Sequence, residues 1–344
     1  MAPPKPNMHD VARLAGVSVA SVSNYFHRPD KISDATRERI REAMDTSGFV
    51  PNAAARTLRT GINLVVGYLA FELASATTSD IAVSIERRVA DRGMHLLMAN
   101  DVGSRDRELS YLRLFEQQRV AGVIVAPLGD VEPELAQMRA RGVASVLSAR
   151  RARSDSQASV YIDHVWGGAV AVRHLVEIGR RRIGFVTSPR GLRQVDDRYA
   201  GARSVVDTTD DVEFEVLEVP ERTVAEGAAC AAALMRRPVD QRPDALFCIN
   251  DLVAIGVMQG LLGAGARIPE DCAVVGYDDI DFAASARVPL TTIRTPHQGL
   301  GEAAADLLFA EIDRLASGTA RGDDKAPHVE FTPELIVRDS TVGP

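Results

Sequence analysis

The sequence has little of what marks membrane, secreted or metal-binding proteins. No apolar run approaches the roughly 18 residues that a membrane-spanning helix needs, and the opening MAPPKPNMHD lacks the apolar stretch of a secretory signal. We therefore expect a cytoplasmic protein with no membrane association. The three cysteines, Cys230, Cys248 and Cys272, have no ligand-like spacing and cannot all pair within one chain. Reduced core thiols are the expectation.

Motifs of catalysis are also missing. The seven histidines are scattered, and the chain contains no Gly-x-Ser-x-Gly elbow, phosphate-binding Gly-x-x-x-x-Gly-Lys-Ser/Thr loop or His-Glu-x-x-His pair. The acidic run at residues 278–281 has no histidine partners, so it is more typical of a helix cap or solvated loop than of a metal site. We predict neither enzymatic activity nor a cofactor. An enzyme of similar architecture is the alternative, and turnover of a candidate ligand would reveal it.

The composition suits a globular chain of several domains. Hydrophobic residues make up 46% and charged residues 25% of the 344 residues, a length that predicts a small domain plus a larger one of about two lobes. The net charge of -7 is unevenly distributed. Residues 1–60 hold nine basic against six acidic residues, a charge of +3, and residues 61–344 hold 31 against 41, a charge of -10. This division favours attraction of phosphate by the first segment alone.

The first sixty residues carry the pattern of three short helices. Apolar residues recur at helical spacing from Met8 until Gly16 ends the segment. A second helix is expected over Val19–Phe26 with Ser18 as its N-cap, and a third after Ser33. Two short helices around a glycine turn predict a helix-turn-helix unit.

Four strings in this region resemble the LacI/GalR family of bacterial repressors. They are DVARLAGVS (residues 10–18), SVSN (21–24), ISDATRERI (32–40) and FVPN (49–52). The resemblance implies that the second helix enters the major groove of double-stranded DNA. His27 departs from the family pattern, which often has asparagine there.

Carried over by position, the resemblance assigns six DNA-contacting residues in this unit. Asn24 can pair with adenine, whereas Val19 and Ala20 offer only apolar contact, for example to a thymine methyl group. The alternative for these two is that they merely pack or face solvent. Phosphate contacts are expected from Ser18, Ser21 and Ser33.

Residues 51–62 are expected to form a hinge between a DNA-binding domain, residues 1–50, and an effector-binding and dimerisation domain, residues 63–344. The segment is alanine-rich and too short to be a stable helix alone. In the resembled family it becomes a helix in the minor groove, where Ala55 and Leu58 would contact and wedge the bases. A plain linker whose Leu58 packs on the larger domain is the alternative.

From residue 64 onward, short Val/Ile/Leu-rich runs alternate with amphipathic stretches, a pattern of parallel sheets covered by helices. The predicted fold is therefore an all-α helix-turn-helix head plus an α/β part with two doubly wound parallel-sheet lobes. The resemblance to the LacI/GalR family implies that this part is a sensor like the periplasmic binding proteins. We place the lobes at about residues 63–163 and 164–290, with C-terminal crossovers.

Ligands of such sheets bind at the carboxyl ends of strands, where Arg198, Asn250 and Asp278 lie in this sequence. The resemblance implies that they hydrogen-bond the hydroxyls of a sugar or sugar derivative. The alternative is that Asn250, Asp251 and Asp278 only cap helices.

The other half of the predicted effector site departs from the family pattern. Phe71 begins a segment that is often rich in proline and asparagine in relatives, and Ala149-Arg150 stands where they often have Asp-Arg. We include Phe71 and Arg150 as effector-binding candidates. His297 replaces an aromatic residue of some members.

The expected assembly is a homodimer that binds a pseudo-palindromic operator, because protein and DNA then share one two-fold axis. The sequence has no leucine heptad near its last residues, so we expect no tetramer built from a tail. A stand-alone sugar-binding or transport receptor is the rival. The basic first segment and the missing signal peptide favour the regulator.

Overall fold

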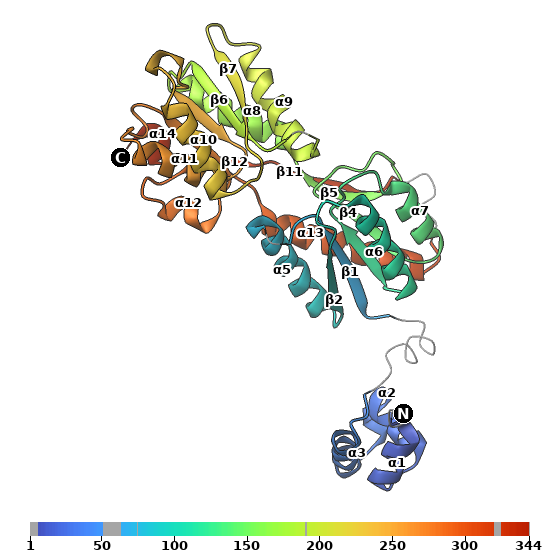
Figure 1. Cartoon of the computed structure of the whole chain (residues 1–344). Helices are drawn as coiled ribbons and strands as arrows, with labels where there is room; N and C mark the ends of the chain where they lie inside the picture. Colours follow the sequence, from blue (N-terminus) through green and yellow to red (C-terminus); the bar gives the residue numbers. More distant parts are fainter. Residues whose placement is uncertain (1–5, 51–62, 74, 190, 320–324, 344) are drawn as a thin grey trace. The chain divides into compact units, whose positions relative to one another are not determined.

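The computed structural model describes residues 6–50, 63–73, 75–189, 191–319 and 325–343. Residues Met1–Asn63 and Leu64–Pro344 form two separate compact units, which we call the head and the body (Figure 1). The described part of the head is helical, and the body contains two six-stranded sheets surrounded by helices. The fold class predicted from the sequence is confirmed.

The head is a three-helix unit with a core of its own. Its helices are α1 (Met8–Ala15), α2 (Val19–His27) and α3 (Asp34–Ser47), with a 3-10 turn at Pro29–Lys31 between the last two. One face of each helix contributes to the core. Its fully buried members are Val11, Ala12, Ala15, Val22, Ile40 and Ala43.

Local hydrogen bonds explain where the head helices begin and end. Gly16 has a left-handed φ of 61°, and its N–H bonds to α1 carbonyls, which ends that helix as expected. Ser18 and Ser33 cap α2 and α3 as predicted. The sequence prediction missed Asn7, which forms a reciprocal capping box with Asp10 at the start of α1.

The first lobe of the body is built on an all-parallel sheet in the order β11-β5-β4-β3-β1-β2. Helices α5 and α13 pack on one face, and α6 and α7 on the other. The strands are β1 (Val65–Ala70), β2 (His95–Asn100), β3 (Gly122–Val125), β4 (Ala144–Ser148), β5 (Ala158–Ile162) and β11 (His328–Phe331). The helices are α5 (Ala76–Asp91), α6 (Arg105–Gln117), α7 (Glu132–Ala140) and α13 (His297–Ala316).

The second lobe has a sheet in the order β12-β10-β9-β8-β6-β7, in which only the β10–β12 pair is antiparallel. Its strands are β6 (Arg182–Thr187), β7 (Glu213–Glu218), β8 (Ala245–Cys248), β9 (Ala273–Asp278), β10 (Thr291–Arg294) and β12 (Glu334–Ile336). Its helices are α8 (His164–Glu177), α9 (Arg193–Val206), α10 (Val224–Met235), α11 (Asp251–Gly263), α12 (Asp281–Ser285) and α14 (Asp339–Val342), with a 3-10 turn at Val239–Gln241.

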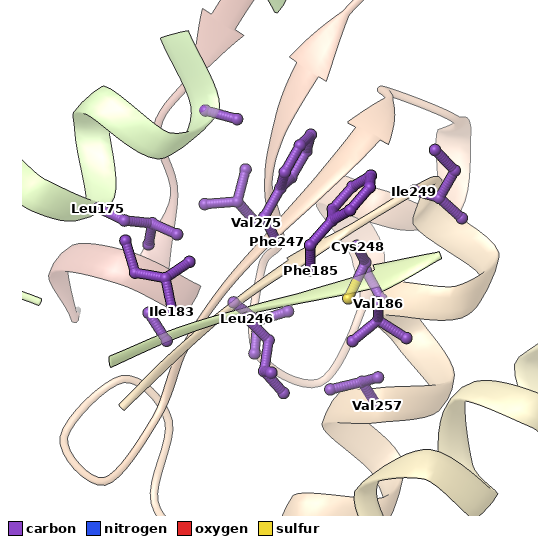
Figure 2. Packing of buried hydrophobic residues seen from close by; sticks show 14 of the residues in the cluster. Leu175, Ile183, Phe185, Val186, Leu246, Phe247, Cys248, Ile249, Val257 and Val275 are labelled. Atoms are coloured by element: carbon purple, nitrogen blue, oxygen red, sulfur yellow. The ribbon is translucent and has the colours of Figure 1, made fainter. Parts of the chain in front are cut away.

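Buried side chains from neighbouring strands form the core of the second lobe. Figure 2 shows Phe185 of β6 beside Phe247 of β8, with their ring centroids 5.0 Å apart. Leu175 of α8 and Val257 of α11 belong to the same cluster. Because this core fixes strands β6, β8 and β9, the residues directly beyond their carboxyl ends are held in defined positions.

Three connections join the lobes. The chain passes from β5 to α8, from β10 to α13 and from β11 to β12, so α13 and β11 near the C-terminus belong to the first lobe. The approach of α8 and α9 just after the first connection is close: a Cβ atom on Gly168 would lie 2.1 Å from the carbonyl oxygen of Arg198. Glycine at this position therefore determines where α9 presents Arg198.

Candidate functional site

Helix α2 carries most of the residues predicted to contact DNA. Ser18 accepts a hydrogen bond from the N–H of Ser21 at 3.0 Å, and the two hydroxyls are 2.9 Å apart. Ala20 is exposed, and Asn24 is half-buried. Val19 is also half-buried and packs against the head core. Part of its side chain therefore packs within the protein, as the alternative to a base contact expected.

Ser33 lies at the start of α3, where its oxygen accepts from the N–H of Thr36 at 3.3 Å. Its hydroxyl is also 3.0 Å from that of Thr36. The hydroxyl proton can therefore serve either Thr36 or an external acceptor such as a phosphate.

The basic side chains of the head fall into two groups. Arg13, Arg37 and Arg41 form ion pairs with acids one turn away on their own helices. Arg28, Lys31 and Arg39 have no carboxylate partner within the described part of the chain. Among the cations in residues 6–50, these three are the ones that an approaching phosphate would meet uncompensated. Ala55 and Leu58, assigned to the minor groove, lie outside the described residues.

In the body, a buried cluster forms around Arg198 of α9. Its Nη1 donates to the carbonyl of Ile249, and its Nη2 lies 3.5 Å from Oδ1 of Asp278. The guanidinium also lies 3.5 Å from the ring centroid of Tyr277, whose hydroxyl is 2.9 Å from Nδ1 of His164. The structure thus brings predicted site residues Arg198 and Asp278 together at the carboxyl ends of β8 and β9.

The polar residues that follow β8 have different roles. Asn250 caps α11, because its Oδ1 accepts from the N–H of Val253 at 3.0 Å. Asp251 accepts from Thr292 Oγ1 at 2.6 Å and from the N–H of Ile280 at 2.9 Å, which ties together segments beyond three strands. Burial, and then the charge of Asp278, raises the pKa of Asp251 to about 8. Asn250 therefore caps a helix, which was the alternative to a role in effector binding. Asp251 stabilises the fold through these two hydrogen bonds.

Asp278 is held in an unusual state. Burial raises its pKa to about 6, although the positive charges of Arg198 and Arg222 oppose the shift. Its φ is 107°, and that of Asp279 is 55°, values that non-glycine residues rarely adopt. Two arginines anchor Asp279: Nε of Arg294 and Nη2 of Arg338 each lie 2.7 Å from its carboxylate. This anchoring stabilises the strained turn that presents Asp278.

Two histidines lie at connections between the lobes. His164 begins α8, and His297 begins α13. Burial lowers the pKa of both, to about 4 for His297, and the charge of Arg198 lowers each further. Both imidazoles are therefore neutral near pH 7 and can accept hydrogen bonds there.

Arg222, which follows β7, was missed by the sequence prediction. It pairs with Glu72 at 2.7 Å, its guanidinium lies 5.7 Å from the ring centroid of Phe71, and its charge acts on Asp278. Because Phe71 and Glu72 follow β1, this side chain links the strand ends of both lobes. We call the strand-end residues that meet here the inter-lobe junction: Phe71, Glu72, Arg198, Arg222 and Asp278.

Arg150 lies beyond β4 in the first lobe, with its side chain 9% exposed. Its Nη1 donates to the carbonyl of Gly129 at 2.9 Å, whereas Nε and Nη2 have no hydrogen-bond partner. No contact joins it directly to Arg198 or Asp278. Burial lowers the pKa of Arg150, and the charges of Asp130 and Glu132 oppose this shift.

The remaining chemistry is limited. Within the ranges described, no group of three or more His, Cys, Asp or Glu side chains could hold a metal ion. Cys230, Cys248 and Cys272 are unpaired by disulfides, and burial raises the pKa of each thiol. None of the helices in these ranges combines the length and apolar character needed to cross a bilayer.

Both the head and the body are similar in sequence to known proteins. Residues 7–52 match the family described as bacterial regulatory proteins, lacI family, and residues 172–341 match the periplasmic binding protein-like domain. The HTH-type transcriptional repressor PurR of Vibrio atlanticus (strain LGP32) is 30% identical over 339 residues, which cover 96% of this chain and 97% of that relative.

Solved structures agree with this similarity. The Lac repressor dimer bound to operator and the anti-inducer ONPF has a TM-score of 0.80 at 25% identity, over 99% of this chain and 100% of that chain. A complex of the transcriptional regulator CelR with cellobiose has a TM-score of 0.68 at 28% identity, over 97% and 99%. These relatives are regulators, in agreement with the expectation that this chain is not an enzyme. The chain belongs to the LacI family of bacterial transcriptional regulators.

Proposed function

We propose that this protein is a sequence-specific transcriptional repressor whose affinity for its operator is set by a small polar ligand, a sugar or sugar derivative, bound between the lobes of the body. The observation that carries the ligand response is the inter-lobe junction, where Arg222 and Arg198 lie at strand ends with Phe71 and Asp278. A molecule bound there would contact both lobes and so favour one of their arrangements.

Recognition of DNA is assigned to α2 and its neighbours. Asn24 would pair with an adenine edge in the major groove, and Ala20 and Val19 would contact apolar groups such as a thymine methyl. Ser18, Ser21 and Ser33 would donate to phosphates. Ala55 and Leu58 would act in the minor groove, as the resemblance to the family implies. The exposed position of Ala20 and the unpaired cations of the head support this assignment.

The working form is a homodimer on a pseudo-palindromic operator. One helix-turn-helix unit reads one half-site, so two copies related by a two-fold axis are needed to read both. The Lac repressor structure to which this chain is similar is a dimer bound to operator, which supports the proposal. A sugar as ligand is supported by the similarity to CelR in its complex with cellobiose. Arg150, Arg198, Asn250, Asp278 and Phe71 are the proposed effector-binding residues.

Selection of bound sequences from random duplexes tests the proposal, with the full chain and with a panel of sugars and nucleosides added separately. We expect a two-fold symmetric consensus whose enrichment changes with one ligand class. A protein that prefers no duplex over bulk competitor at moderate salt, under every ligand condition, would refute the function.

A further inference from the structure

Polar atoms without a hydrogen-bond partner gather at the carboxyl ends of strands in both lobes. In the first lobe they include Oγ of Ser148, at the end of β4, Nε and Nη2 of Arg150, and Oδ2 of Asp101 beyond β2. In the second lobe they are Oγ of Ser188, directly after β6, and Nε of Arg198. The side chains of Arg150 and Arg198 are 9% exposed, and Ser148 and Ser188 are buried. Buried polar groups are nearly always satisfied by protein, water or ligand, so this set marks a place where a polar ligand can bind.

Nearby acids do not satisfy Arg150. Its Nη2 lies 3.8 Å from Asp130 and 3.7 Å from Glu132, beyond hydrogen-bond distance. Both carboxylates have closer donors: Asp130 pairs with Arg153 at 3.0 Å, and the two oxygens of Glu132 accept from the N–H groups of Arg153 and Ser154 at 2.8 Å. Two N–H groups on one edge of the Arg150 guanidinium therefore remain open.

The unpartnered donors of the two lobes belong to one region. Ser148 and Arg150 lie at the carboxyl end of β4, at the same sheet edge as Glu72 beyond β1, and Glu72 pairs with Arg222 beyond β7 of the second lobe at 2.7 Å. Ser188 follows the strand that pairs with β8, and the carbonyl of Ile249 beyond β8 accepts from Arg198. A single ligand could thus meet donors from both sides.

We infer that the effector carries an anionic group, a carboxylate or a phosphate, which Arg150 binds through Nε and Nη2 while Arg198 and Ser188 donate to other oxygens of the same molecule. This inference rests on the proposed function, because it specifies the ligand of the same site. The Nε–Nη2 edge of a guanidinium donates two parallel hydrogen bonds that match two oxygens of one anion. A neutral polyol would need an acceptor for each hydroxyl as well as donors.

The acceptors of this region leave Arg150 open to an anion. Asn250 uses its Oδ1 to cap α11, and Asp251 is fully engaged. Oδ2 of Asp101, beyond β2, is buried and unpartnered, and among the described residues the carboxylate of Asp278 has only Arg198 beside it, at 3.5 Å. Neither acid is within hydrogen-bond distance of Arg150, so its Nε and Nη2 remain available to an anion.

Binding of defined probes to the full chain tests the inference. Gluconate supplies a carboxylate, glucose 6-phosphate supplies a phosphate, and inorganic phosphate supplies the anion alone, with glucose and inosine as neutral counterparts. We expect titration calorimetry to detect at least one of the anions, and glucose to bind at least tenfold more weakly than its charged derivative. Comparison of gluconate with glucose 6-phosphate then distinguishes carboxylate from phosphate.

Variants of Arg150 test whether this residue causes the preference for anionic over neutral probes. Arg150→Gln should weaken binding of the anion by about tenfold to a hundredfold, since it removes charge-assisted hydrogen bonds. Arg150→Lys should lose less, because it keeps the charge without the two-pronged edge. Arg267→Gln, which removes an exposed arginine paired with Asp271, is the matched control and should leave binding unchanged. The melting temperature without ligand shows whether each variant is folded.

Three results would overturn the inference: no anion of the panel binds, a neutral probe binds as tightly as its charged counterpart, or folded Arg150→Gln keeps the anion affinity. Operator binding in ligand-free buffer is measured on the same samples. If operator binding is intact while the anion preference fails, only the ligand class is wrong. If the protein binds no operator at all, the proposed function itself is refuted, whatever the ligand-binding result.

Discussion

Single residues at the inter-lobe junction are held in states that cost stability, and Asp278 is the clearest example. Its pKa of about 6 exceeds the ordinary 3.8, so between these values the folded state binds more protons than the unfolded state. The contribution of Asp278 to the free energy of unfolding is therefore most favourable at low pH and is lost as the pH rises through 6. Above that, the buried charge is a net cost that the ion pair with Arg198 does not offset.

We predict that Asp278→Asn raises the free energy of unfolding by about 1–2 kcal/mol at pH 7.5, because it removes the charge that burial disfavours, as the raised pKa of Asp278 indicates, and keeps the size of the side chain. The advantage should shrink toward pH 4, where the wild-type carboxyl is protonated. Urea unfolding at several pH values measures both. A variant less stable than wild type at pH 7.5 would mean that the Arg198 pair outweighs the cost of burial.

Asn24 is the residue with which base recognition can be tested most directly. Replacing it by alanine removes the amide that we propose pairs with adenine, so the preference at one operator position should weaken by about 1–3 kcal/mol while other positions keep theirs. Selection from random duplexes, run beside wild type, measures this. An unchanged consensus with uniformly weaker binding would assign Asn24 a phosphate contact or a structural role instead.

At the scale of elements, the close contact between α8 and α9 at Gly168 sets the position of Arg198 in the site. We predict that Gly168→Ala destabilises the body by about 1–3 kcal/mol and weakens ligand binding, because the new Cβ meets the carbonyl of Arg198 and displaces α9. Thermal unfolding and ligand titration provide the readouts.

Gly263→Ala is the matched control for that substitution. Gly263 is the last residue of α11, and a Cβ there meets no atom within 4 Å. Alanine should therefore be neutral or stabilise by about 0.5–1 kcal/mol. If both variants lose ligand binding equally, the α8–α9 contact is not what positions Arg198.

Elements with strong periodicity were predictable from sequence. The amphipathic stretches expected between the apolar runs include α6 (Arg105–Gln117) and α8 (His164–Glu177). Strand β7 (Glu213–Glu218) was missed because it is an edge strand whose acidic residues alternate with apolar ones, whereas the prediction relied on continuous apolar runs. The threonine-rich β10 and the three-residue β12 were missed for similar reasons.

The same limit applies to the site. Arg198 and Asp278 follow strongly apolar strands, so their positions at strand ends could be predicted. Arg222 could not, because the strand before it was itself missed. The φ values of Asp278 and Asp279 also have no signal in the sequence, since they depend on Arg294 and Arg338 from distant segments.

At the scale of the whole molecule, head and body have separate cores, so each should fold without the other. We predict that a fragment of residues 64–344 keeps the cooperative unfolding of the body and binds the ligand with unchanged affinity, yet loses affinity for operator. Calorimetry and a duplex-binding assay test this. A fragment that unfolds without a cooperative transition would mean that the body depends on the first 63 residues.

The three connections between the lobes limit how the body can move. They comprise one residue, Asp163, and two pairs, Thr295-Pro296 and Thr332-Pro333. Sliding or separating the lobes would stretch at least one of these short links, and each proline fixes its own φ. Because three short links hold the lobes at once, rotation of one lobe against the other is favoured over sliding or separation. A small molecule touching both sides can then select an angle without remodelling either lobe.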